Sequence, residues 1–295
     1  MDGSPEQSLS AHSLTKPNSS FMPIIKDLPS AQYHSDKSTV SKHGLDNFAK
    51  APAFFRHKLD FPMESNNPAF RWGTLVHLVV LEPHNWDKEA IVMTEKCDRR
   101  TTKGKEAFAE FSTQAAGRIV VTKDEEMQLQ DIAASVHAHP VVQGLFNDNH
   151  NVEDSVYWRD EVTGQKCRCR PDLYTSYVVA DLKTCNDASD HGFGNSAAAF
   201  RYHVQDSFYI DGLRANGIEV EKFIFIVVEK EAPYLVRCLE LADVSREAGR
   251  AAYKRDLSRL VECAKTNTWP GLSREVRKVK LPSYADGMTE LYGGV

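Results

Sequence analysis

The sequence has 295 residues, a formal net charge of −5 and 41% hydrophobic residues. Such a composition excludes an intrinsically disordered chain, a collagen and a small disulfide-rich scaffold. The negative net charge argues against a protein that coats nucleic acid by bulk electrostatic attraction, but it leaves a local basic groove open.

The sequence lacks the features of a membrane or secreted protein. No apolar run approaches the ~20 residues that span a bilayer, and the N-terminus has no apolar signal stretch. The six cysteines are scattered, as is usual for reduced thiols, and they do not have the spacing of a zinc site. We therefore expect a cytoplasmic protein with no membrane partner.

The first half of the chain is expected to be mainly helical. Residues 1–30 are rich in Ser, Pro and Asn, which predicts a disordered tail. Residues 31–285 are expected to form a single domain, with a C-terminal tail at 286–295. Apolar spacing and the positions of proline predict helices at 42–50, 53–59, 69–81, 105–116, 123–138 and 141–147, with a strand at 88–95.

The second half changes to strand-rich sequence. A turn at 160–164, where Gly164 suits a positive φ, joins two expected strands. The remaining pattern predicts strands at 152–159, 165–172, 177–183, 222–229 and 234–240, with long helices at 195–216 and 243–265. Together these elements predict one α/β domain with a central mixed β-sheet flanked by helices.

Two carboxylates and a lysine are expected at one edge of this sheet. Asp181 and Lys183 are two apart on a strand and therefore share a face. Asp172 ends the preceding strand after Pro171, so a hairpin-like pairing would place it beside Asp181. Leu182 would point into the core and leave its carbonyl free to turn toward the site.

This combination suits hydrolysis of a phosphodiester bond. The carboxylates can hold Mg²⁺ or Mn²⁺, which polarises a phosphate oxygen and activates a bound water. The lysine would position that water or offset the charge of the transition state. Each fragment alone has an ordinary explanation, because Asp often forms turns and an Asp-x-Lys strand often faces solvent.

Further segments resemble a known nuclease family. Pro171 and Asp172, followed by the Asp-Leu-Lys at 181–183, look like the motif of the PD-(D/E)xK nuclease superfamily. The order of the other segments resembles its RecB-like branch and, within that, the exonuclease VIII (RecE-type) family. The matching segments are residues 33–34 (YH), 41–45 (SKHGL), 73–77 (GTLVH), 81–83 (LEP), 153–158 (EDSVYW), 168–172 (RCRPD), 181–184 (DLKT) and 202–209 (YHVQDSFY). The resemblance implies a restriction-endonuclease-like core.

The resemblance also implies roles for individual residues. The implied metal ligands are His77, Asp172, Asp181 and the Leu182 carbonyl, while Glu153 would bind a second metal through water or only orient a neighbouring residue. Lys183 would be the catalytic lysine, and Gln205 and Tyr209 would line the site on one helix face. Without the resemblance, a lone histidine in an apolar helix is more often a core residue, and the Gln205 helix is an ordinary amphipathic one.

Basic side chains are candidates for contacts with the DNA backbone, because phosphates attract positive charge whatever the base sequence. One candidate cluster lies in the loop before the helix at 105–116, and a second lies on the strand that leads to Asp172. The candidates are Arg99, Arg100, Lys103, Arg168, Arg170 and Arg201. A solvated surface is the ordinary alternative for such residues.

The resemblance implies an Mg²⁺-dependent exonuclease that digests linear double-stranded DNA from 5′ ends and leaves 3′ tails for phage-type recombination. It implies a ring-like homo-oligomer, expected to be a tetramer, and a single-strand annealing protein as partner. The cysteines do not fit an iron–sulfur cluster, and no nucleotide-binding P-loop is present. A structure-specific or single-strand nuclease, and a non-catalytic DNA-binding scaffold, are the alternatives.

Overall fold

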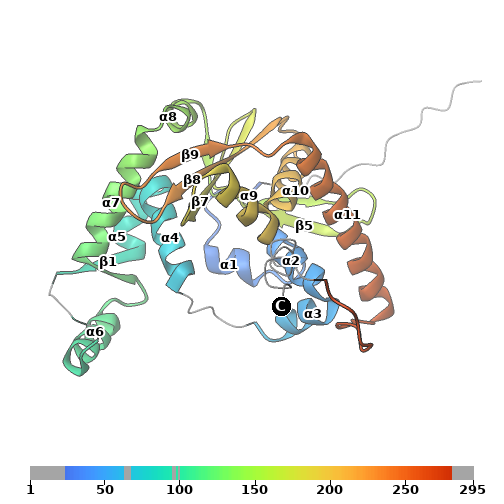
Figure 1. The fold of residues 1–295 in the computed structure, drawn as a ribbon, viewed down its shortest axis with the longest axis horizontal. Coiled ribbons are helices and arrows are strands. Elements are labelled where there is room, and N and C mark those ends of the chain that lie inside the picture. The colour runs from blue at the N-terminus through green and yellow to red at the C-terminus, as the bar shows by residue number, and fades with distance from the viewer. Residues whose placement is uncertain (1–23, 63–67, 95–97, 99, 281–295) are drawn as a thin grey trace, which may run out of the picture.

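A five-stranded mixed sheet lies at the centre of the molecule (Figure 1). The computed structural model describes residues 24–62, 68–94, 98 and 100–280. In spatial order the strands are β3 (Asn151–Val152), β6 (Leu173–Tyr174), β7 (Val178–Cys185), β8 (Lys222–Glu229) and β9 (Val236–Leu239). Strands β7 and β8 are parallel and the other neighbours are antiparallel, so the predicted mixed sheet is confirmed.

Helices cover both faces of the sheet. Alternate residues of β7 and β8 point to opposite faces, and both faces are apolar. One face packs against α4 (Pro68–Leu81) and α7 (Lys123–Ala138), and the other packs against α10 (Tyr202–Arg214). Helix α11 (Asp243–Thr266) lies outside α10 and forms part of the same core cluster. A sheet that is buried on both faces explains why β7 and β8 read as nearly continuous apolar runs.

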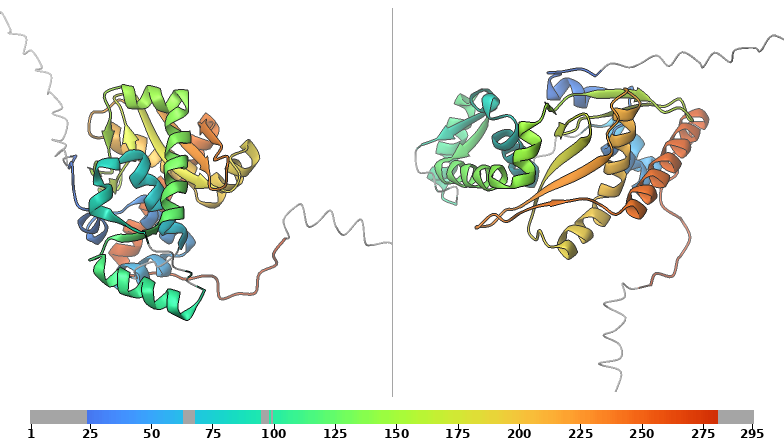
Figure 2. Two further views of the ribbon diagram at one scale, coloured as in Figure 1. Left: turned by 90° about the vertical axis from the view of Figure 1, so that its left-hand side faces the viewer. Right: turned by 90° about the horizontal axis from the view of Figure 1, so that it is seen from above.

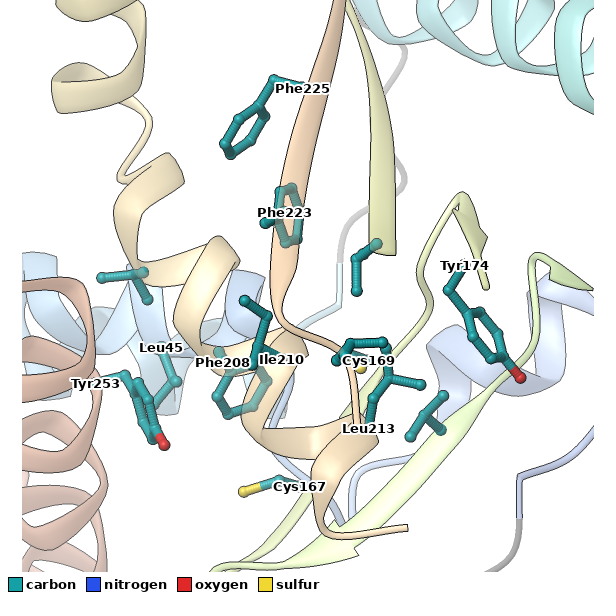
Figure 3. Packing of buried hydrophobic residues seen from close by; sticks show 14 of the residues in the cluster. Leu45, Cys167, Cys169, Tyr174, Phe208, Ile210, Leu213, Phe223, Phe225 and Tyr253 are labelled. Carbon is teal, nitrogen blue, oxygen red and sulfur yellow. The ribbon is translucent and has the colours of Figure 1, made fainter. Parts of the chain in front are cut away.

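Aromatic rings fill the layer between the sheet and α10. Phe208 of α10 lies 4.6 Å from the ring of Trp158 and 5.4 Å from that of Tyr253 on α11. Phe223 and Phe225 of β8 contact each other with ring centroids 4.7 Å apart. Figure 3 shows Phe208, Phe223, Phe225 and Tyr253 in this layer. The packed layer fixes α10 against the sheet, and α10 carries residues of the candidate site.

The remaining helices largely follow the predicted pattern. These are α1 (Ser30–Ser35), α2 (Lys42–Lys50), α3 (Pro52–Asp60), a 3₁₀ turn (Pro83–Asn85), α5 (Trp86–Glu89), α6 (Thr102–Gln114), α8 (Pro140–Asn147) and α9 (Asp190–Ala199). Ser41 accepts a hydrogen bond from the Gly44 amide and so caps α2. Helix α6 lies at the periphery, away from the central sheet (Figure 2). In the described part of the chain, no helix is long and apolar enough to cross a membrane.

Two small sheets complete the fold. Strands β4 (Val156–Arg159) and β5 (Lys166–Cys169) form an antiparallel hairpin, and β1 (Ala90–Met93) pairs in parallel with β2 (Ile119–Thr122). Gly164 in the hairpin turn has φ 69°, as its position predicted. Strand β2 was not predicted, because three apolar residues and a threonine between two helical patterns carry little periodic signal.

The N-terminal segment contacts the hairpin earlier than the expected boundary at residue 30. Ile25 exchanges backbone hydrogen bonds with Ser155, and the helix α1 begins at Ser30. The part of the predicted tail at 1–23, and the C-terminal tail at 286–295, lie outside the described residues.

Two predicted strands are shorter than expected. The strand at 152–159 is divided at Glu153, which has φ 54°, into β3 and β4. The strand at 165–172 ends at Cys169, and Asp172 lies between β5 and β6 rather than within a ladder. Both breaks fall at the level of the candidate site, where backbone irregularity commonly serves to aim a side chain.

The predicted long helix at 195–216 is two helices. Arg201 has φ 54°, which ends α9 and starts α10 in a new direction. Its guanidinium lies 3.2 Å from Asp46 and 2.5 Å from Asp256. The left-handed conformation at a non-glycine residue costs free energy that these ion pairs help to offset. Helical periodicity continues across Arg201, so the sequence pattern did not reveal the break.

The contact between α10 and α11 is close enough to require glycine. A Cβ at Gly249 would lie 1.9 Å from the carbonyl oxygen of His203. We expect Gly249→Ala to lower the free energy of unfolding by at least about 1–3 kcal/mol, because backbone cannot yield as a side chain can. Chemical denaturation measures the change.

Gly144→Ala is the matched control for this variant. Gly144 lies within α8, and a Cβ there meets nothing within 4 Å. Alanine should leave the stability unchanged or raise it by up to about 1 kcal/mol. Equal effects of the two substitutions would contradict the close helix contact.

Candidate active site

Antiparallel pairing of β6 with β7 brings Asp172 and Asp181 to one place, as predicted. Leu173 is registered opposite Ala180, so the residues on either side of this pair are also neighbours. The Asp172 carboxylate accepts a hydrogen bond of 2.7 Å from the backbone amide of Leu182. Because that amide belongs to the central strand, the bond fixes Asp172 at the sheet although Asp172 is outside a strand.

His77 reaches the same place from α4, on the other face of the sheet. Its Nε2 lies 2.9 Å from the carbonyl oxygen of Leu182. Its Nδ1 lies 3.5 Å from the Asp172 carboxylate and 3.8 Å from that of Glu153. The structure thus brings together His77, Glu153, Asp172 and the Leu182 carbonyl, which the sequence had suggested as ligands.

The unusual backbone of Glu153 aims its side chain at this group. Its positive φ turns the chain between β3 and β4, and its amide donates to the carbonyl of Asp172 over 3.3 Å. Nonglycine residues in this region are uncommon and are often found where geometry serves a function. Spacing alone could not show this conformation, so the assignment of Glu153 from sequence depended on the family resemblance.

The arrangement fits a divalent metal ion. Ligand atoms of His77, Glu153 and Asp172 all lie within 4.8 Å of one another. Adjacent ligands of an octahedral ion with bonds of about 2.1 Å are about 3 Å apart, and the 3.5 Å between His77 Nδ1 and the Asp172 carboxylate is close to this spacing. Carboxylate and carbonyl oxygens with one imidazole suit Mg²⁺ or Mn²⁺ better than a soft metal.

Asp181 has a different environment from the one expected of a central metal ligand. Its carboxylate forms an ion pair with Lys183 and accepts a hydrogen bond of 2.5 Å from the Gln205 amide. Asp181 and Gln205 are both buried. Asp181 and Lys183 therefore share a face as predicted, and Gln205 reaches the site. Glu153 lies closer to His77 and Asp172 than predicted.

The electrostatics of the site favour bound cations. Burial opposes the charged form of His77, but the carboxylates of Asp172 and Glu153 outweigh it and raise the pKa of His77 to about 9. Burial and the neighbouring Asp181 raise the pKa of Asp172 well above its ordinary range. Lys183 is partly buried, and Asp181 and Asp172 outweigh its desolvation and hold its pKa above the usual value, so it stays a cation.

These groups open into a large cleft. The cleft has a volume of about 1730 Å³, which exceeds the roughly 300–1,000 Å³ of common small-molecule pockets. Its lining includes His77, Glu153, Lys183 and Gln205, together with residues of α2 and of the α9–α10 junction. Tyr209 was expected to line the site but is not among the described residues that line the cleft. Its ring packs against Phe223, with ring centroids 6.1 Å apart.

The predicted DNA-binding residues divide into two groups. Arg170 and Arg201 line the cleft. Arg170 donates to Ser155 and to the Leu28 carbonyl, and Arg201 pairs with the acidic side chains described above. Both guanidinium groups thus already have protein partners, and their contact with DNA stays a prediction.

Arg168 does not face the cleft, which corrects the prediction that it shares a DNA-facing surface with Arg170. It is buried, and it donates to the carbonyls of Asp36 and Thr39. Lys103 lies in the first turn of α6 and Arg100 in the loop before it, and neither is among the residues that line the cleft. Arg99 lies outside the described residues.

Two residues of the site were not predicted. Lys42 of α2 lines the cleft and donates to the carbonyl of Phe200 over 2.6 Å. Tyr202 at the start of α10 presents its ring to the Lys183 ammonium, which lies 5.1 Å from the ring centroid. Both residues come from segments that carry the family resemblance, but only the tertiary structure shows that they approach Lys183.

Comparison with known proteins identifies the family. A family described as a PDDEXK-like domain of unknown function (DUF3799) matches residues 41–282. The chain belongs to this family. The match confirms the predicted nuclease superfamily and fold, whereas the resemblance to the exonuclease VIII branch is finer than this family and stays a prediction. A comparison with curated proteins gives no match.

A solved structure has the same fold as this PDDEXK-like domain. A protein from Eubacterium rectale, described as a "putative exonuclease", superimposes with a TM-score of 0.60 at 17% identity, over 91% of this chain and 99% of that one. A second structure, that of SSO0001, matches at 16% identity over 66% of this chain and 86% of that chain. Its TM-score of 0.27 is too low to indicate a shared fold.

Removal of one ligand should weaken metal binding. Loss of a residue that merely supports a ligand costs about 10–100-fold in affinity, so we expect Asp172→Asn or His77→Ala to cost at least this much. Calorimetric titration with Mn²⁺ measures the affinity. Glu82→Gln removes a carboxylate that lines the same cleft outside the ligand group, and it should bind Mn²⁺ as the unmodified protein does.

Asp172→Asn should also stabilise the metal-free protein. Because burial and Asp181 disfavour the charged form of Asp172, a neutral isostere relieves repulsion and can still accept from the Leu182 amide. We expect a melting temperature in EDTA that is a few degrees higher than that of the unmodified protein, with the metal-induced increase lost. A lower melting temperature in EDTA would contradict this electrostatic account.

Proposed function

We propose that the protein is a metal-dependent nuclease that hydrolyses phosphodiester bonds of DNA. The observation that carries this proposal is the convergence of His77, Glu153, Asp172 and the Leu182 carbonyl at a cleft, next to the ion pair of buried Asp181 with Lys183. Membership of a PDDEXK-like family supports the same chemistry.

The residues of the site would divide the work of hydrolysis. His77, Asp172 and Glu153, with the Leu182 carbonyl, would hold a divalent cation, for which we propose Mg²⁺. When bound, such an ion polarises a phosphate oxygen and lowers the pKa of a bound water. Lys183 would place its positive charge next to the phosphate, where charge develops in the transition state. Gln205 holds Asp181, and Asp181 in turn holds Lys183.

The size and charge of the cleft support a polymeric substrate. A volume of 1730 Å³ accommodates more than one nucleotide unit. The lining mixes basic and acidic residues, so attraction of the phosphate backbone by bulk charge is limited, and the metal site would supply much of the local positive charge. A protein of this kind does not need the basic pI of a DNA-coating protein.

We further propose that the substrate is the end of linear double-stranded DNA. The resemblance to the RecE-type exonucleases supports digestion from 5′ ends that leaves 3′ tails for phage-type recombination. It also supports a ring-like homo-oligomer, proposed to be a tetramer, and a single-strand annealing protein as partner. Ring closure around the duplex would give processivity without a strongly basic surface.

An end-labelled digestion distinguishes these activities. A linear duplex labelled at one 5′ or one 3′ end is incubated with the protein in Mg²⁺ and in EDTA, beside a closed circular duplex and a single strand. We expect Mg²⁺-dependent early release of the 5′ label and an intact circle. Cutting of the circle would indicate an endonuclease, and exclusive loss of the single strand would indicate a single-strand nuclease. Absence of metal-dependent loss of every substrate would contradict the proposal.

Lys183→Met tests the catalytic site within this assay. The substitution removes the ammonium and keeps the length of the side chain, so the rate should fall by roughly 10²–10³-fold or more. Lys88→Met removes another lysine that lines the cleft and should retain the rate within a few-fold. An equal loss in both variants would mean that Lys183 contributes general charge only.

A further inference from the structure

A column of aromatic rings runs from the core of the protein to the candidate active site. Phe225 on β8 is fully buried, and its position in the sheet is opposite Asp181. The ring of Tyr202 stacks on Phe225 with centroids 5.5 Å apart and planes at 23°. The ring of Phe200 stacks on Tyr202 at 5.8 Å and 25°. Each ring of the column is therefore stacked on the next.

The outer ring of this column is exposed in the cleft. Phe200 is 61% exposed, although one face of its ring is covered by Tyr202, and it lines the cleft. An exposed phenylalanine on a protein surface costs little and needs no explanation when it stands alone. Phe200 differs because it ends a stack and lies in the cleft that holds the candidate catalytic residues.

The backbone of Phe200 is held firmly. Its carbonyl accepts a hydrogen bond of 2.6 Å from Lys42. The next residue, Arg201, has the left-handed conformation that separates α9 from α10, and its ion pairs with Asp46 and Asp256 hold that break. Lys42 is itself paired with Asp46 at 2.7 Å. A strained junction stabilised from several elements fixes an exposed ring in one position.

The same tyrosine links this ring to the catalytic lysine. The ammonium of Lys183 lies 5.1 Å from the centroid of Tyr202, and the ammonium of Lys42 lies 5.8 Å from it. Two lysine ammonium groups of the cleft lining and one exposed aromatic face are thus grouped around a single side chain. This is the combination that binds a nucleotide strand without base preference, because cations attract the backbone and every base can stack on an aromatic ring.

We propose that Phe200 is a stacking platform for an unpaired base of the strand being cut, close to the scissile phosphate. A base within a duplex has both faces covered, so Phe200 would select a nucleic acid whose terminal base is unpaired or can be unpaired. This inference rests on the proposed nuclease function and adds a determinant of substrate choice to it. Tyr202 is a positioning residue that supports both Phe200 and Lys183.

Binding of a fluorescent base tests the platform. A short duplex with an unpaired end that carries 2-aminopurine is titrated with the full-length protein in EDTA, where no cleavage is expected. Stacking quenches this fluorophore. We expect the unmodified protein and Phe200→Trp to quench the fluorescence. Phe200→Ala should quench less and bind the duplex at least about fivefold more weakly, because it loses one base–aromatic stack.

Phe61→Ala is the matched control. Phe61 is also a phenylalanine that is 61% exposed, but it follows α3 and is not among the residues that line the cleft. It should behave as the unmodified protein in the titration. Unchanged melting temperatures of the Phe200 and Phe61 variants would show that neither substitution disturbs the fold.

A second comparison removes the base instead of the ring. An abasic site at the unpaired end should weaken DNA binding by the unmodified protein. The loss of affinity should be about as large as the loss that Phe200→Ala causes with the intact end. The abasic site should weaken binding by Phe200→Ala itself only slightly. The inference would be overturned if the abasic site weakened binding equally for the unmodified protein and for Phe200→Ala. It would also be overturned if Phe200→Ala bound and quenched the intact end as Phe61→Ala does.

The two proposals can fail separately. If the unmodified protein digests DNA with Mg²⁺ but Phe200→Ala binds and quenches as the control does, the stacking platform is wrong and the nuclease proposal stands. If the unmodified protein neither binds the duplex nor digests any DNA, both proposals are wrong.

Discussion

The hydrogen bond from the Leu182 amide to Asp172 determines much of the candidate site. It ties a residue outside any strand to the central strand of the sheet, next to Asp181 and within reach of Glu153 and His77. Grouped carboxylates repel one another, and burial adds to the cost of their charge. The fold tolerates this arrangement because two apolar clusters fix the sheet from both faces and because Lys183 and His77 contribute positive charge.

The elements around the site each serve a separate need. Helix α4 supplies His77 from one face of β7, and α10 supplies Gln205 from the other. These two contacts reach consecutive residues of the same strand, Leu182 and Asp181, whose side chains point to opposite faces. The breaks at Glu153 and Arg201 then direct side chains into the space between the helices. A site of this kind needs long-range packing, and no single segment of the chain could form it alone.

Much of this could be predicted from the sequence, because strong local signals coincide with the site. The apolar run of β7, the dipeptide Pro171–Asp172 and the spacing of Asp181 and Lys183 predicted the mixed sheet and the meeting of the carboxylates. The burial of Arg168, the division of the helix at Arg201 and the approach of Tyr202 to Lys183 could not be predicted. Each depends on partners distant in the chain, such as Thr39 and Asp256, whose positions leave no periodic trace.

The central claim is that His77, Glu153, Asp172 and the Leu182 carbonyl form one divalent-metal site. Anomalous diffraction from crystals soaked in Mn²⁺ tests it most directly, because it locates the ion independently of any activity. The account predicts an anomalous peak within bonding distance of Asp172 and His77, at the end of β7. A peak held by other residues of the cleft, or no peak at Mn²⁺ concentrations that support DNA digestion, would contradict it.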